Sequence, residues 1–275
     1  MPKAGRRTSV QDAVALSLTV HQPDGRLQAL AEATLPALVK RYQAVTALCS
    51  AETHPTFIDL LLQQGVSVAK EVRSPGGIER LGDTKRDTLR LGLSTGASRV
   101  HMCDFDRALH WVTHYPQELD DVIADAARFD YLVLGRTARA WDSHPAYQRH
   151  TEWLFNHVYG LIAGQAWDIG AGSRAVSPPA GALLLARSTE PSVGIDAEWP
   201  LLVGGDPGLR LGYRACEGLE FETADRYAPE IEAAGGYAAW LRDVESDPGR
   251  WAFRLRVAML IADAALHTAV GRGES

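Results

Sequence analysis

The chain has 275 residues, of which 46% are hydrophobic and 23% are charged, and its formal net charge is −6. This composition is typical of a globular protein with a sizeable core, and one large domain is expected because no long Pro/Ser/Gly linker divides the chain. A duplex nucleic-acid binder usually carries a basic stripe, so the lack of one argues against nucleic acid as a partner.

Short apolar runs alternate with helical patterns through the first half of the chain. Apolar runs bounded by turn residues predict strands, and apolar residues at i, i+3 and i+4 predict helices. The predicted strands cover residues 13–20, 44–49, 66–69, 99–103 and 130–134. The predicted helices cover residues 26–41, 55–64, 84–95 and 116–127, with a loop at 73–83. This alternation predicts an α/β fold with a mainly parallel, Rossmann-like sheet and helices on both faces.

The second half is less regular. Its predicted elements are a helix over residues 149–163, a loop over 165–181, an apolar run over 182–186, a helix over 197–203, a strand over 212–222 and an amphipathic helix over 250–267. The last helix carries Arg250, Arg254 and Arg256. Packing over the sheet or dimerisation is favoured for this helix over contact with a membrane, because amphipathic surface helices usually face the core.

Neither the cysteines nor the apolar segments suggest an extracellular or membrane protein. Cys49, Cys103 and Cys216 lie in apolar stretches and are predicted to be buried, reduced thiols. No stretch approaches the roughly 20 apolar residues of a transmembrane helix, and the first residues lack the apolar segment of a signal peptide. A cytoplasmic location is therefore expected.

The sharpest feature is Asp104-Phe105-Asp106, which directly follows the predicted strand RVHMC. Two carboxylates at i and i+2 on extended backbone point the same way and can share one hard cation. Mg²⁺ and Mn²⁺ prefer oxygen ligands and often take one or two carboxylates together with substrate phosphates. Asp104 and Asp106 are therefore predicted to hold a divalent ion at the open end of the sheet, the alternative being two solvated aspartates.

At these residues the sequence resembles the GT-A glycosyltransferases, especially the group of dolichyl-phosphate mannose synthases and glucosyl- and mannosyl-phosphoglycerate synthases. The resemblance rests on the acidic pair and on the order of three further segments, GDTKRDTLRLGL, WDIGAGSRAVS and GIDAEWPLLVGGDPGLRLGYRACEGLEFE. It implies a catalytic domain over residues 12–225, with a nucleotide-sugar half at about 12–110 and an acceptor half at about 111–225. Residues 1–11 are then an N-terminal segment and residues 226–275 a C-terminal helical extension.

The resemblance implies a hexosyltransferase that uses Mg²⁺ or Mn²⁺ and a nucleoside-diphosphate sugar. Asp104 and Asp106 would hold the metal and the donor diphosphate, and Glu52 is a loose match to the acidic residue that binds the base. Asp196 or Glu198 would deprotonate the acceptor hydroxyl. In the family the loop that holds Asp168, Ser173 and Arg174 faces the sugar and the acceptor.

The remaining assignments come from residue chemistry. Lys85 or Arg86 is predicted to contact the diphosphate, the alternative being a solvated helix start. Arg174 is predicted to hold an acceptor phosphate or carboxylate, the alternative being a structural ion pair. Asp196 and Glu198 have as their alternative a helix N-terminal charge. His101 is expected to be a core histidine rather than a metal ligand.

Two other functions remain open from the sequence. A nucleotidyltransferase shares the fold and also uses acidic residues with a metal, although HQPDGR lacks the glycine density expected after its first strand. A non-catalytic nucleotide-binding scaffold would keep the fold without the reaction. The acceptor is expected to be a small soluble molecule or a lipid phosphate, and a homodimer stays open.

Overall fold

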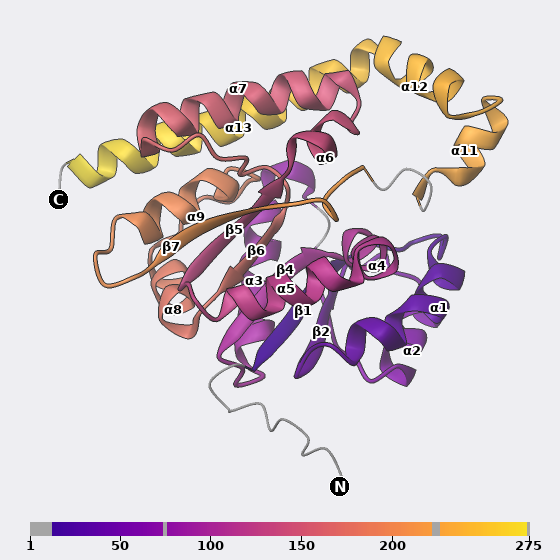
Figure 1. Ribbon diagram of the computed structural model, residues 1–275, viewed down its shortest axis with the longest axis horizontal. Coiled ribbons are helices and arrows are strands. Elements are labelled where there is room, and N and C mark those ends of the chain that lie inside the picture. The colour runs from indigo at the N-terminus through magenta and orange to yellow at the C-terminus, as the bar shows by residue number, and fades with distance from the viewer. Residues whose placement is uncertain (1–12, 74–75, 222–225, 274–275) are drawn as a thin grey trace, which may run out of the picture.

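The structure of the chain, a computed structural model, describes residues 13–73, 76–221 and 226–273. A seven-stranded sheet runs through the molecule in the order β3-β2-β1-β4-β6-β5-β7 (Figure 1). β6 is antiparallel to both neighbours, and the other neighbouring strands pair in parallel. The strands are β1 (Val14–Val20), β2 (Ala44–Cys49), β3 (Ser67–Lys70), β4 (Arg99–Asp104), β5 (Tyr131–Arg136), β6 (Ser173–Val176) and β7 (Leu211–Cys216).

Helices cover both faces of the sheet. One face packs on α1 (Gln28–Val39), α2 (Pro55–Gln63), α4 (Phe105–His114) and α5 (Pro116–Ala126). The other face packs on α3 (Leu81–Leu93), α7 (Ala146–Ala163), α8 (Pro178–Arg187), α9 (Ile195–Gly204) and α13 (Pro248–Gly273). The remaining elements are the 3₁₀ turn η2 (Gly77–Glu79) and the helices α6 (Ala138–Asp142), α11 (Ala228–Ala233) and α12 (Tyr237–Ser246).

Local chemistry explains where several helices begin. Thr137 and Ser177 have extended backbone, and their hydroxyls accept hydrogen bonds from the amides of Ala140 and Ala180, which caps α6 and α8. α8 then starts with Pro178 and α2 starts with Pro55, at the first-turn position that proline favours. The helices of the α/β units therefore begin close to the strand ends.

The predicted α/β class is confirmed, with a mainly parallel sheet, helices on both faces and a C-terminal helix. The predicted loop 73–83 also contains η2 and the start of α3, and the predicted loop 165–181 contains β6. The strand predicted over 212–222 ends at Cys216. The helices α4, α6, α8, α11 and α12 were not predicted; α8 covers the end of the predicted loop and the apolar run over 182–186.

The C-terminal helix α13 packs along α7 and α9, as expected of an amphipathic helix over the sheet (Figure 1). The N-terminal segment predicted at residues 1–11 lies outside the described residues, and so does the predicted boundary at 225/226. All three cysteines are buried and unpaired, as predicted. None of the helices in the described part of the chain combines the length and apolar character needed to cross a membrane.

Candidate functional site

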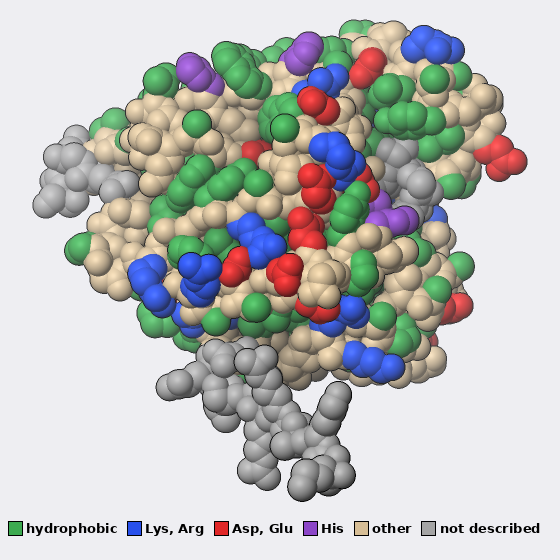
Figure 2. Space-filling view, viewed as in Figure 1, with side chains coloured by type: hydrophobic (Ala, Val, Ile, Leu, Met, Phe, Trp, Pro, Cys, Tyr) green, Lys and Arg blue, Asp and Glu red, His purple; other side chains and the backbone are tan. Residues whose placement is uncertain are grey.

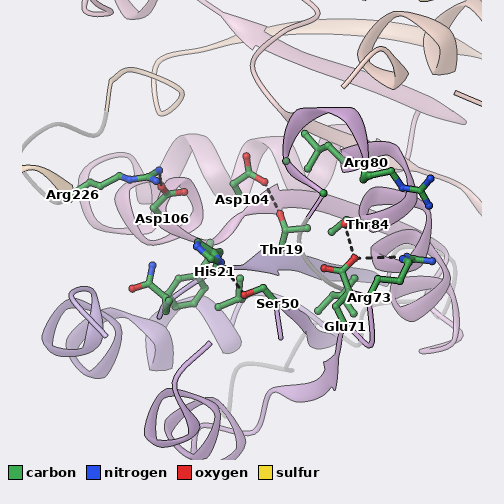
Figure 3. A pocket seen from close by; sticks show the side chains of 17 residues that line it. Thr19, His21, Ser50, Glu71, Arg73, Arg80, Thr84, Asp104, Asp106 and Arg226 are labelled. Atoms are coloured by element: carbon green, nitrogen blue, oxygen red, sulfur yellow. Dashed lines mark hydrogen bonds and ion pairs between the residues drawn. The ribbon is translucent and has the colours of Figure 1, made fainter. Parts of the chain in front are cut away.

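A cleft of about 300 Å³ opens at the carboxyl ends of β1, β2 and β4. Ligands of open parallel sheets bind at this edge, where strand ends and the loops that follow them meet. Figure 3 shows Asp104 and Asp106 along one side of the cleft, with Glu71 and Arg73 toward its other end. The cleft is also lined by Gly76, Gly77 and Arg80 before α3, by Leu81 and Thr84 at its start, and by the distant Arg226.

Asp104 is held at the end of β4 by Lys85 and Thr19. In the parallel register Thr19 of β1 lies beside Asp104. The Thr19 hydroxyl donates to Oδ1 of Asp104 at 2.6 Å, and Nζ of Lys85 donates to the same oxygen at 2.5 Å. Lys85 also donates to Oγ1 of Thr19 at 3.0 Å. The strand end and α3 are thus joined by a three-residue hydrogen-bonded cluster.

This cluster keeps Asp104 ionised. Burial alone would raise the pKa of its carboxyl, but the charge and hydrogen bond of Lys85, together with the hydrogen bond from Thr19, lower the pKa to about 2. Lys85 is only 4% exposed, so the alternative of a solvated helix start is wrong for this residue. All the contacts just described use Oδ1 of Asp104, and Oδ2 lies near Gly172, where an added Cβ would come within 3.2 Å of it.

Contrary to the prediction, Asp104 and Asp106 do not both lie on extended backbone. β4 ends at Asp104 and α4 begins at Phe105, so Asp106 lies in the first turn of a helix rather than on extended backbone. The i, i+2 rule for extended chains therefore does not apply. Both carboxylates nevertheless line the same cleft, and Asp106 forms an ion pair with Arg226 (Figure 3).

Arg86, the second basic residue predicted to contact a diphosphate, is used inside the fold. Its guanidinium donates to Oγ of Ser188 at 3.0 Å, to the carbonyl of Glu190 at 2.7 Å and to Asp83 at 2.5 Å. Arg86 is 9% exposed and is not among the residues that line the cleft. The basic residues found on the cleft wall are instead Arg73, Arg80 and Arg226.

Arg174 and Asp196 form a buried ion pair at 2.7 Å. Arg174 lies on β6, with its guanidinium over the ring of Trp199 at 5.6 Å. Burial raises the pKa of Asp196, against the opposing charge of Arg174, and the charges of Lys85 and Asp104 also act on it. Neither residue lines the cleft, so the placement matches the structural ion pair that was the alternative for Arg174.

Glu198 accepts hydrogen bonds from the loop that precedes α9. Its carboxylate accepts from Oγ of Ser188 at 2.5 Å and from the amides of Thr189 and Glu190 at 3.0 and 3.2 Å. Glu198 is 5% exposed. These contacts use both carboxylate oxygens of Glu198. Glu198 therefore stabilises the 188–190 loop, and it does not line the cleft.

The predicted base-binding residue Glu52 lies outside the cleft wall. Its side chain is 55% exposed, and its Oε2 lies 3.9 Å from Nε2 of His21. Glu71, which directly follows β3, lines the cleft in its place and accepts from the Thr84 hydroxyl at 2.7 Å. The sequence contained the signal, because Glu71 is the acidic residue at the end of the third predicted strand.

Asp168 and Ser173 also bind other residues of the fold and do not line the cleft. Asp168 accepts from the guanidinium and the backbone amide of Arg136 at 2.7–2.9 Å. The Ser173 hydroxyl contacts Nε2 of His101 at 2.9 Å, and the Tyr42 hydroxyl contacts Nδ1 at 2.8 Å. Burial lowers the pKa of His101 to about 4, so the expected core histidine is found.

The buried, neutral His101 should make the free energy of unfolding depend on pH. Its pKa is about 4 in the fold, against 6.5 for an unperturbed histidine, so between these pH values only the unfolded chain binds a proton. The stability that depends on neutral His101 is therefore complete above pH 6.5 and is lost as the pH falls toward 4. This change amounts to roughly 3 kcal/mol of unfolding free energy. Urea denaturation should show a flatter pH slope for His101→Gln than for the wild type, and equal slopes would contradict the assignment.

No family model matches the sequence, and no curated protein matches it. Solved structures give matches at low identity. A glucosyl-3-phosphoglycerate synthase from Mycobacterium tuberculosis with Mn²⁺, UDP and phosphoglyceric acid is 16% identical, with a TM-score of 0.48 over 73% of this chain and 67% of that one. The UDP complex of the same enzyme gives 15% identity and a TM-score of 0.45 over 94% and 79%.

A further match is described as a mycobacterial protein, with 14% identity and a TM-score of 0.49 over 84% of this chain and 80% of that one. The named neighbours belong to the synthase group that the sequence resembles. Identities of 14–16% and TM-scores below 0.5 assign neither a family nor an activity to this chain.

Proposed function

We propose that the protein is a metal-dependent glycosyltransferase, which moves a sugar from a nucleoside-diphosphate sugar to a small, phosphorylated acceptor. The observation that carries the proposal is the pair of carboxylates Asp104 and Asp106 on one cleft at the carboxyl edge of the sheet. A cleft of about 300 Å³ is at the lower end of the range of small-molecule sites. Arginines on its wall supply partners for phosphate oxygens.

The residues present fit a divalent ion of the Mg²⁺ or Mn²⁺ type. Lys85 and Thr19 both bind Oδ1 of Asp104, and the Asp106 carboxylate lines the same cleft. The described residues contain no group of three or more His, Cys, Asp or Glu side chains able to hold a metal, so donor phosphate oxygens would have to complete the coordination. Mg²⁺ is commonly bound in this way, by one or two carboxylates and the phosphates of its substrate.

The bound ion would supply stabilisation of the leaving nucleoside diphosphate. Lys85 and Thr19 fix the orientation of the Asp104 carboxylate, so this ligand needs no reorganisation when the donor binds. Arg80, whose side chain is 57% exposed and 2.5 Å from Asp83, is positioned on the cleft wall to bind a phosphate through its planar fork. Glu71 and Ser50, from the ends of β3 and β2, line the cleft. They are proposed to contact the base of the donor nucleotide, the role predicted for Glu52.

Asp196 is the proposed base for the acceptor hydroxyl, although it is buried and is not among the residues that line the cleft. Of the two predicted carboxylates it is the one on which the charges of Lys85 and Asp104 act, whereas Glu198 binds the 188–190 loop. Burial raises the pKa of Asp196, and a carboxylate with a higher pKa is a stronger base. Arg174 and Asp196 are 2.7 Å apart, so their ion pair would have to open in part when the acceptor binds.

The decisive experiment is thermal unfolding with Mn²⁺ and either UDP or GDP, followed by assays with nucleotide sugars and phosphorylated acceptors. A ligand that binds only the folded state stabilises it by about 2.7 kcal/mol at one hundred times its dissociation constant. The proposal requires a Mn²⁺-dependent shift, together with release of nucleoside diphosphate that depends on the acceptor.

The same assays separate the alternatives. A nucleotidyltransferase would consume a nucleoside triphosphate and a sugar phosphate and release pyrophosphate. A non-catalytic scaffold would give the thermal shift without turnover of any donor. Absence of a shift with both nucleotides, in the presence and absence of Mn²⁺, would reject nucleotide binding altogether.

A further inference from the structure

An apolar surface lies on the outward sides of two adjacent helices. Large hydrophobic side chains are exposed there on α7 and on α13, and Figure 2 shows hydrophobic and histidine side chains along the upper edge of the molecule, over these helices. We call this surface the α7–α13 face. It is defined by Trp153 (57% exposed), Leu154 (45%), Leu161 (74%), Leu255 (48%), Met259 (64%) and Leu266 (50%).

The exposed side of α13 has a repeat of its own. Small and apolar residues recur with alternating spacings of three and four, and the inner side of the helix is already satisfied by core residues such as Val257, Ile261 and Ala265. A surface helix of a monomer needs one apolar stripe, whereas a second stripe with this spacing is the signature of a helix that pairs with another. The outer stripe consists of Ala252, Leu255, Met259, Ala262, Leu266 and Ala269.

The charges beside this stripe disfavour a lipid surface. Arg254 turns inward to Glu152, Arg256 pairs with Glu79, and Arg250 lies 3.6 Å from Asp247. Attraction to anionic lipids depends on basic side chains whose charge is available at the surface. These arginines are each matched by an acidic side chain of the same chain, so a protein partner fits the surface better.

We propose that the α7–α13 face is the interface of a homodimer, in which the α13 helices of two copies pair antiparallel. In this arrangement Leu255 lies opposite Leu266 of the second copy, and Met259 lies opposite Ala262. By the same register Ala252 lies opposite Ala269, so the helices approach closely at the ends of the seam, and each Met259 has the small Ala262 of the second copy beside it.

The charges select the antiparallel orientation. Arg256 and Asp263 are seven residues apart, so they lie on the same flank of α13 and are separated by about 10 Å along its axis. Reversing one helix about the centre of the seam brings Arg256 close to Asp263 of the second copy, twice per dimer. A parallel pairing keeps the two charges apart. The guanidinium has five donors and can bind Glu79 and the second copy together.

The size of the face suits such a dimer. α13 has 26 residues and α7 has 18, so they are roughly 39 Å and 27 Å long, and each presents a strip roughly 10 Å wide. Together the strips offer roughly 650 Å², close to the ~800 Å² that each partner contributes to a standard interface.

Sedimentation equilibrium over a concentration series tests the interface directly. The wild-type chain should have twice the mass of one chain at micromolar concentration. Met259→Lys should raise the dimer dissociation constant by more than about thirtyfold, because it places a charge in the centre of the seam. Leu62→Lys, at a 53% exposed site on α2, is the matched control and should leave the dimer intact.

Cross-linking tests the orientation. An oxidised mixture of the Leu255→Cys and Leu266→Cys chains should give a disulfide-linked dimer, whereas either variant alone should not. A wild-type monomer at all concentrations, or a dimer unaffected by Met259→Lys, overturns the proposal. So does self-linking of Leu255→Cys alone, which indicates parallel helices, or binding of the monomer to vesicles of phosphatidylserine that Met259→Lys abolishes.

Discussion

Replacing Asp104 with asparagine is expected to abolish the Mn²⁺-dependent stabilisation by a nucleoside diphosphate and to lower kcat/KM at least about a hundredfold. The change removes the charge of a carboxylate proposed to hold the metal, while it keeps an oxygen that Lys85 and Thr19 can reach. Losses of this size are typical when one preorganised electrostatic group is removed from an active site. Thermal shift with Mn²⁺ and either UDP or GDP measures the binding part.

The control for this prediction has to separate binding from folding. Asp104→Asn leaves the buried Lys85 without a charged partner, and an unpaired buried charge is strongly destabilising. The double variant Lys85→Met/Asp104→Asn should recover much of the stability and still fail to bind. Asp59→Asn, at an exposed position on α2, should behave as the wild type. Normal Mn²⁺-dependent binding by the double variant would remove Asp104 from the proposed site.

The fold could be predicted where strands and helices differ clearly in pattern. β1, β2 and β4 are apolar runs buried on both faces, and the helices between them have one apolar side. α4 was missed because it follows β4 with no turn residues between them. β6 was missed because Ser173 and Arg174 do not look like strand residues. Their burial is stabilised by His101 and Asp196, which come from distant parts of the chain.

The candidate site, too, could be predicted from the sequence only in part. Asp104 and Asp106 line the cleft, as expected of acidic residues that follow a buried strand, whereas Lys85, predicted to contact a diphosphate, binds Asp104 instead. Arg86 binds Asp83 close by but also Glu190, 104 residues away, and Arg174 binds Asp196, 22 residues away. No local pattern distinguishes a side chain that binds a ligand from one that is bound by its own fold. Burial decides between these roles, and burial depends on tertiary packing.

The largest effect on stability is expected at Glu152, far from the cleft. This carboxylate is 3% exposed and accepts from two arginines, Arg136 at the end of β5 and Arg254 of α13. Arg136 is buried as well, and Asp168 is its only other acidic partner among the described residues. Glu152 therefore joins the sheet to the C-terminal helix through a charge cluster with little access to water.

Glu152→Ala should lower the free energy of unfolding by about 3 kcal/mol. The change leaves the buried Arg136 with Asp168 as its remaining acidic partner, and it removes the acceptor of Arg254. Glu152→Gln should cost less, since it keeps the shape and one acceptor oxygen. Urea denaturation measures both, with Glu232→Ala on the exposed side of α11 as the control within ±0.5 kcal/mol. Because Arg254 anchors α13, hydrogen exchange should also quicken in α13 before it does in β1. A loss below 1 kcal/mol would mean that α13 is held by its apolar contacts alone.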